Sequence, residues 1–142
     1  MCSYEAIVRD AVTTDERPRC RSAQEVRDLV GPDMETLAQE QMRVILLNTR
    51  LAVVDVVTVY QGTVDTAVVR MAELFRPAIV QNVPSIILCH NHPSGDPTPS
   101  AEDRAMTEQA RKVGELLQIT VLDHVVVARG GAVSLRESMS WN

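Results

Sequence analysis

An apolar run that ends in two histidines and a proline, followed by a long amphipathic stretch, constrains the fold of this chain most. Residues 85–90 read Ser-Ile-Ile-Leu-Cys-His and predict a buried strand, which Pro93 ends because proline donates no backbone hydrogen bond. From Ser100 to Leu117 the apolar residues recur at helical spacing, with Ser100 as the expected N-cap. A buried strand followed by a helix is a building unit of α/β folds.

Strand and helix patterns alternate along the rest of the chain. We expect a helix from Ser22 to Leu29 that stops at Gly31-Pro32, and a second short helix capped by Asp33. The other predicted elements are strands at 42–47, 51–60, 119–128 and 132–135 and a helix at 68–80, which Pro77 is expected either to kink or to interrupt with the start of a new turn. Residues 1–21 predict an N-terminal arm and residues 22–142 one domain, for which we expect an α/β fold, a three-layer α/β/α sandwich around a mixed sheet.

Composition and charge exclude several classes of protein. The 142 residues contain no apolar stretch long enough to span a membrane, and the net charge is −5. We therefore do not expect membrane association or direct nucleic-acid binding, which usually needs a clustered basic surface. The three cysteines are an odd number without a Cys-x-x-Cys pair, which predicts a reducing, cytoplasmic location. Cys89 is expected to be a small buried hydrophobic residue.

The two histidines and an aspartate on the following helix predict a metal site. Alternate residues of a strand share a face, so His90 and His92 are expected to project together about 6–7 Å apart. Three residues before Met106, Asp103 lies on the helix face turned toward the sheet, where a buried carboxylate needs a cation or several donors. The alternative for Asp103 is a capping box with Ser100. Three such ligands are typical of a zinc site that leaves one position for water.

A hydrolytic zinc site also needs a base, and the residue pattern alone does not choose one. Glu40 opens an apolar strand, although an ordinary exposed carboxylate at a strand end is the simpler interpretation. For His124, a structural role in its strand competes with a role behind the metal ligands or at the substrate. The carboxylates that we consider as the base are Glu40, Asp55, Glu73 and Asp123.

A family resemblance covers most of the chain. The segment His-Asn-His-Pro at 90–93, followed by Ser100 and Asp103, is similar to the JAMM (MPN-plus) motif of zinc metallopeptidases. The wider segments 88–97, 122–127 and 134–137 resemble the RadC-like bacterial branch, a JAB domain, and the similarity extends from about residue 22 to residue 138.

The resemblance implies a cytidine-deaminase-like JAB/MPN fold with one zinc ion per chain, held by His90, His92 and Asp103. It implies Glu40 as the base, and Ser100 as the residue that holds the water or stabilises the oxyanion. The implied activity is that of a zinc metallopeptidase. It would hydrolyse a peptide or isopeptide amide in a peptide or protein substrate by Glu-assisted attack of zinc-bound water. Asn91, which suits the RadC-like branch, is expected to point away from the metal.

Two departures from the family pattern leave rival functions open. Residues 69–75 lack the His-Pro pair that RadC-like chains often carry, and we expect no N-terminal helix-hairpin-helix domain in the 142 residues. The family's traditional label suggests a DNA-repair-associated protein, although we do not expect the family's usual DNA-binding module in these residues. The other rival is an interaction module that catalyses nothing. Exposed strand edges would allow a homodimer.

Overall fold

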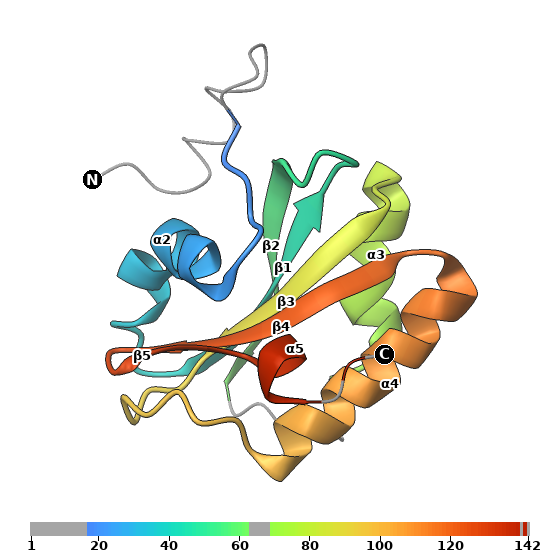
Figure 1. Ribbon diagram of the computed structural model, residues 1–142. Coiled ribbons are helices and arrows are strands. Elements are labelled where there is room, and N and C mark those ends of the chain that lie inside the picture. Colours follow the sequence, from blue (N-terminus) through green and yellow to red (C-terminus); the bar gives the residue numbers. More distant parts are fainter. Residues whose placement is uncertain (1–16, 63–68, 140, 142) are drawn as a thin grey trace.

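The computed structural model describes residues 17–62, 69–139 and 141. It contains a five-stranded mixed sheet in the order β2-β1-β3-β4-β5, in which only β3 and β4 run parallel (Figure 1). The strands are β1 (Glu40–Leu47), β2 (Val53–Gly62), β3 (Ser85–Asn91), β4 (Thr120–Ala128) and β5 (Gly131–Ser134). The helices are α2 (Ala23–Met34), α3 (Met71–Gln81), α4 (Ala101–Leu117) and α5 (Leu135–Ser138).

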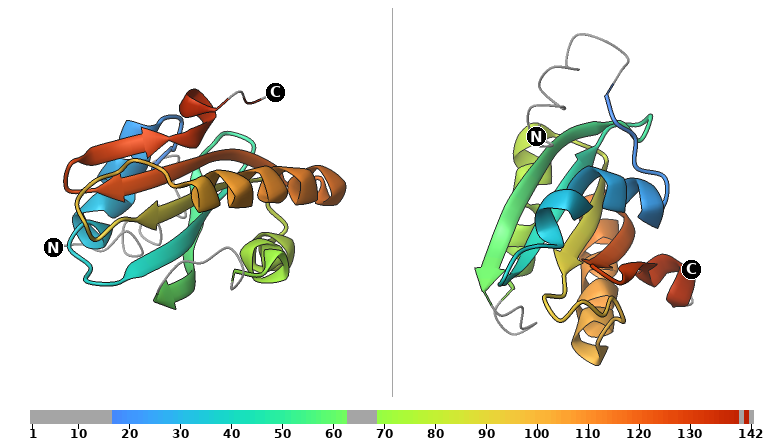
Figure 2. Two further views of the ribbon diagram at one scale, coloured as in Figure 1. Left: turned by 90° about the horizontal axis from the view of Figure 1, so that it is seen from below. Right: turned by 90° about the vertical axis from the view of Figure 1, so that its left-hand side faces the viewer.

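Helices cover both faces of the sheet, and each face has its own apolar core. Helix α2 lies on one face of the sheet, and α3 and α4 lie on the other (Figure 2). Alternating side chains of β1 divide between the faces, so that Met42 and Val44 pack toward α3 and α4 while Ile45 packs toward α2. Helix α4 connects the parallel strands β3 and β4. The expected α/β fold with a mixed sheet between helical layers is confirmed.

Strand β3 lies at the centre of the sheet, and all its residues from Ile86 to Asn91 are buried. Cys89 is fully buried on the α2 face, with its Sγ 3.8 Å from Sδ of Met34, as expected for a small hydrophobic residue. Burial raises the pKa of the Cys89 thiol, so the thiol stays protonated. The candidate functional side chains of β3 therefore lie on its α4 face and at its carboxyl end.

The predicted helix stop at Gly31-Pro32 was wrong, because α2 continues to Met34 with Pro32 inside it. Proline in the last turn removes only one hydrogen bond, and the backbone N–H of Glu35 still donates to the carbonyl of Gly31 at 2.8 Å. Asp33 therefore caps no second helix. Its carboxylate instead forms an ion pair of 2.6 Å with Arg43 of β1.

Several other element boundaries differ from the predictions. Helix α3 passes through Pro77 without a new start, and the predicted first residue of that helix, Val68, lies outside the described residues. Strand β5 ends at Ser134, whose side chain caps the unpredicted helix α5 by accepting from the N–H of Glu137.

Among the described residues, no helix is long and apolar enough to cross a membrane.

The close turn at the end of α4 requires a glycine. The buried face of α4 ends at Gly114, and Leu117, which we predicted to continue it, is 43% exposed. The chain turns back so closely there that a Cβ atom on Gly114 would lie 2.5 Å from the carbonyl oxygen of Ile119. Gly114 thus allows the close turn that leads from the end of α4 toward β4.

Candidate metal centre

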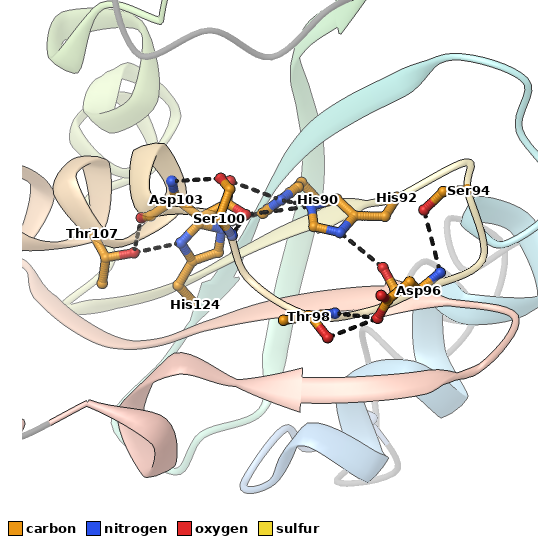
Figure 3. A network of polar contacts seen from close by, with 9 residues as sticks. All are labelled: His90, His92, Ser94, Asp96, Thr98, Ser100, Asp103, Thr107 and His124. Carbon is orange, nitrogen blue, oxygen red and sulfur yellow. Dashed lines mark hydrogen bonds and ion pairs between the residues drawn. The ribbon is translucent and has the colours of Figure 1, made fainter.

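The three predicted ligands converge at the carboxyl end of β3 (Figure 3). Nε2 of His90 lies 3.0 Å from Nε2 of His92 and 3.1 Å from Oδ1 of Asp103. Nε2 of His92 lies 3.3 Å from Oδ2 of Asp103. Ligands bonded at about 2.0–2.1 Å to a tetrahedral ion lie roughly 3.3 Å from one another. The spacing and the nitrogen and oxygen donors of this set therefore fit zinc.

His92 follows directly after β3, and the loop beyond it fixes the ring. Its Nδ1 lies 3.0 Å from the carbonyl oxygen of Asp96. Because a carbonyl oxygen only accepts hydrogen bonds, Nδ1 carries the proton, and in the neutral ring Nε2 keeps its lone pair. The lone pair on Nε2 faces His90 and Asp103. The tautomer of His92 with its proton on Nδ1 is therefore the one that a metal ligand needs.

Asp103 combines two roles that the sequence analysis treated as alternatives. Its Oδ2 accepts a hydrogen bond from the backbone N–H of Ser100 at 2.8 Å, and its own N–H donates to Oγ of Ser100 at 3.1 Å. This is a complete capping box. Oδ1 meanwhile faces His90, so the same carboxylate caps the helix and reaches the ligand cluster.

The pKa values of the cluster show mutual stabilisation of opposite charges. Burial by itself would raise the pKa of Asp103, but the imidazoles of His90 and His92 beside its carboxylate outweigh burial and hold that pKa well below its usual range. The hydrogen bond to Asp103 raises the pKa of His92, although burial opposes this shift. The negative charges of Asp103 and Glu40 also raise the pKa of His92. The centre therefore favours positive charge at the point where the three ligands meet.

Glu40 lies on the same side of the sheet as the ligands. Met42 pairs directly with His90 across β1 and β3, and Glu40 comes two residues earlier on the same strand face. Glu40 is partly exposed at the end of β1, and its charge acts on His92. Glu40 is therefore placed beside the ligand cluster without belonging to it.

Asn91 holds the backbone on both sides of Glu40. Its Oδ1 accepts from the N–H of Gln41 at 2.7 Å, and its Nδ2 donates to the carbonyl of Gln39 at 3.1 Å. As expected, this side chain is turned to β1 rather than to the ligands. The residue between the two histidines thus fixes the segment that carries Glu40.

The other carboxylates considered as bases lie elsewhere. Asp55 accepts from Val56 and Gln81 on the β2 edge. Glu73 forms a 3.7 Å ion pair with Arg70 at the start of α3. Asp123 is buried, and accepts from the hydroxyl of Ser134 at 2.7 Å and from the N–H groups of His124 and Arg136.

His124, for which we weighed a structural role against a role behind the metal ligands, contacts His90. The ring is fully buried under α4, and its Nε2 lies 2.6 Å from Nδ1 of His90. Its Nδ1 lies 2.6 Å from Oγ1 of Thr107, which in turn donates to the carbonyl of Asp103 at 2.7 Å. Burial, and then the charge of His90, lower the pKa of His124 well below its ordinary value. Thr107 was missed, although it follows Asp103 by four residues and so shares its helix face.

The loop between the ligands is tied to the turn between β4 and β5. Gly95 has φ of +93°, a conformation that favours glycine, and its carbonyl accepts from the N–H of Gly130 at 2.9 Å. Arg129 donates to the carbonyl of Pro93 at 3.3 Å. These contacts hold the loop whose Asp96 carbonyl orients His92.

The fold and this centre agree with the family to which the chain is similar. The family described as RadC-like JAB domain matches residues 20–140. This chain therefore belongs to the RadC-like JAB domain family.

Relatives from several bacteria carry the name UPF0758 protein. One from Roseiflexus castenholzii is 47% identical over 123 residues, which are 87% of this chain and 53% of the relative. One from Chloroflexus aurantiacus is 44% identical over 131 residues, 92% of this chain and 56% of the relative. One from Clostridium kluyveri is 45% identical over 119 residues, 84% of this chain and 52% of the relative. The chain thus spans about half the length of these relatives.

Proposed function

We propose that this chain is a zinc-dependent hydrolase of the metallopeptidase type that cleaves a peptide or isopeptide amide. The observation that carries the proposal is the convergence of Nε2 of His90, Nε2 of His92 and a carboxylate oxygen of Asp103 beside a further carboxylate, Glu40. Three ligands of this kind leave one position of a tetrahedral ion free, as catalytic rather than structural zinc sites do. Membership in the JAB domain family supports the same function.

His90, His92 and Asp103 would hold the metal ion. When bound, zinc supplies Lewis acidity to a substrate carbonyl and lowers the pKa of water toward about 7. Both the capping box and the Asp96 carbonyl orient the ligands before any ion arrives, so the site needs little reorganisation.

Glu40 is the residue that we propose as the general base. From the end of β1 its carboxylate would take a proton from the attacking water and deliver it to the leaving amine. Asn91 supports this role because it anchors the backbone before and after Glu40. The identity of the substrate is left open by these residues.

Ser100 is proposed to stabilise the oxyanion that forms at the substrate carbonyl. In the capping box its Oγ acts as an acceptor for the N–H of Asp103, so its hydroxyl proton is not needed for the cap. The hydroxyl can therefore donate to an oxyanion while the helix stays capped.

The experiment that tests the proposal is cleavage of a mixed pool of linear peptides and peptides branched through a lysine isopeptide bond. New products are detected by mass spectrometry with zinc-loaded wild type, chelator-treated wild type and zinc-loaded Glu40→Gln, an isosteric control that only loses the base. We expect products with zinc-loaded wild type and a loss of about 10²-fold or more in the other two. Cleavage that survives both changes would contradict the mechanism. Zinc binding without any cleavage would favour a non-catalytic interaction module.

A further inference from the structure

We propose that His124 and Thr107 are positioning residues that fix the tautomer in which His90 can bind a metal ion. The inference rests on the proposed metal site and adds two residues that do not touch the ion. A continuous chain of hydrogen bonds leads from Nδ1 of His90 through both residues to the backbone carbonyl of Asp103 (Figure 3).

The carbonyl of Asp103, at the far end of this series of hydrogen bonds, sets the direction of every hydrogen bond in the series. The carbonyl of Asp103 can only accept, so the single hydroxyl proton of Thr107 is donated to it at 2.7 Å. Oγ1 of Thr107 must then accept from Nδ1 of His124, which lies 2.6 Å away. An imidazole that donates through one nitrogen presents the other nitrogen as an acceptor, and Nε2 of His124 meets Nδ1 of His90. Nε2 of His124 is therefore the acceptor.

The last hydrogen bond determines what His90 can do. Because Nε2 of His124 accepts, Nδ1 of His90 carries a proton and donates across 2.6 Å. Nε2 of His90 then keeps its lone pair, and this atom faces His92 and Asp103. This series of hydrogen bonds from Asp103 through Thr107 and His124 to His90, which we call the relay, thus fixes the tautomer of His90 that can bind a metal ion.

Thr107 is the residue that determines which way the hydrogen bond between His124 and His90 is donated. Metal-bound histidines usually donate their second N–H to a carboxylate or a carbonyl, which cannot donate in return. His92 follows this rule through the carbonyl of Asp96, but His90 meets an imidazole, which can either donate or accept. If the relay ran in reverse, the proton of His90 would sit on Nε2, between the other two ligands. His124 and Thr107 are both fully buried, which hinders water from replacing the hydroxyl.

The tautomers can be observed directly, because the chain contains only three histidines. In zinc-loaded wild type with ¹⁵N-labelled histidine, two-bond ¹⁵N–¹H correlation spectra are expected to show a proton on Nδ1 and not on Nε2 of His124. They are also expected to show a proton on Nδ1 of His90. A proton on Nε2 of His124 would overturn the proposal, and this readout needs no variant and no substrate.

A matched pair of variants tests the role of the hydroxyl. Thr107→Val keeps the shape and removes the hydroxyl, and we expect zinc affinity to fall about 10- to 100-fold in competition with a chromophoric chelator. Thr107→Ser keeps the hydroxyl and should retain most of the affinity. Equal affinities in wild type and Thr107→Val would overturn the relay while leaving the metal site intact. Absence of zinc binding in wild type would instead overturn the proposed function, and the relay with it.

Discussion

The backbone N–H of Ser100 donates to Oδ2 of Asp103 at 2.8 Å, and this bond joins the start of helix α4 to the candidate metal centre. The same carboxylate presents Oδ1 to His90. The capping box therefore holds the side chain of Asp103 in place through contacts within its own helix, and this restraint does not need a cation. Helix capping and ligand placement are a single structural feature in this protein.

Two substitutions at Ser100 separate capping from chemistry. Alanine at an N-cap costs about 1 kcal/mol of stability, whereas glycine costs only a few tenths, and both remove the hydroxyl. We expect Ser100→Ala to lower the unfolding free energy more than Ser100→Gly in urea denaturation. If the hydroxyl stabilises an oxyanion, both variants should lose hydrolysis to a similar extent. If instead Ser100→Gly hydrolyses nearly as well as wild type while Ser100→Ala loses activity, activity depends on stability, and the Ser100 hydroxyl takes no part in the reaction.

The stability of the metal-free protein should depend on pH through His92. The pKa of His92 is raised and that of Asp103 is lowered. A raised histidine pKa adds stability that is complete below the unfolded value of about 6.5 and is lost as pH rises through the folded value. A lowered aspartate pKa adds stability that is complete above about 3.9 and is lost as pH falls. Both contributions therefore coexist between about pH 4 and 6.5.

The measurement is urea denaturation of chelator-treated wild type and His92→Gln from pH 5 to 8. We expect the advantage of wild type to be largest near the acidic end and to shrink as pH rises through the raised pKa of His92. The opposite contribution of His124, whose pKa is lowered, is common to both proteins and largely cancels. An advantage that does not change with pH would show that the ion pair between His92 and Asp103 contributes nothing.

Removing the side-chain amide of Asn91 should affect both stability and the proposed base. Asn91→Leu leaves the N–H of Gln41 and the carbonyl of Gln39 without their side-chain partner, which we expect to cost about 1–3 kcal/mol. Zinc binding should persist and hydrolysis should fall, because the segment around Glu40 loosens. The control is Gln39→Ala, which keeps its backbone carbonyl and loses only a surface contact with Gln61. Equal unfolding free energies for the two variants would contradict this role of Asn91.

Gly114→Ala should destabilise the protein, although alanine is the better helix former. Helix propensity favours alanine by up to about 1 kcal/mol. The added Cβ would however lie 2.5 Å from the backbone carbonyl of Ile119, which cannot move as a side chain would. We expect a net loss of about 1–3 kcal/mol in thermal or urea unfolding. Glu115→Ala, on the exposed side of the same turn, is the control and should change stability little. A stabilised Gly114→Ala would show that α4 can shift freely.

The sequence predicted the cluster of candidate ligands because the spacing of the three residues is local. His90 and His92 lie on either side of one residue at a strand end, and Asp103 lies in the first turn of the next helix. Periodicities of two and 3.6 residues place such groups on defined faces. Glu40 was different, because its place beside the candidate ligands depends on the pairing of β1 with β3. The residue pattern did not predict this pairing, and only the family resemblance suggested Glu40 as the base.

The relay could not be predicted, since it depends on contacts between distant segments. His124 meets His90 because β4 pairs with β3 in parallel, and Thr107 reaches His124 because α4 packs against β4. The continuation of α2 through Pro32 was missed because proline was treated as a helix stop, whereas in a last turn it removes only one hydrogen bond.

The most direct test of the metal centre is the zinc content of wild type and His92→Ala after dialysis against zinc and then against zinc-free buffer. Glu40→Gln serves as the control, because Glu40 lies beside the ligands without belonging to them. We expect about one zinc ion per chain in wild type and Glu40→Gln, and almost none in His92→Ala. Equal zinc content in wild type and His92→Ala would contradict the assignment of His90, His92 and Asp103 as the metal ligands.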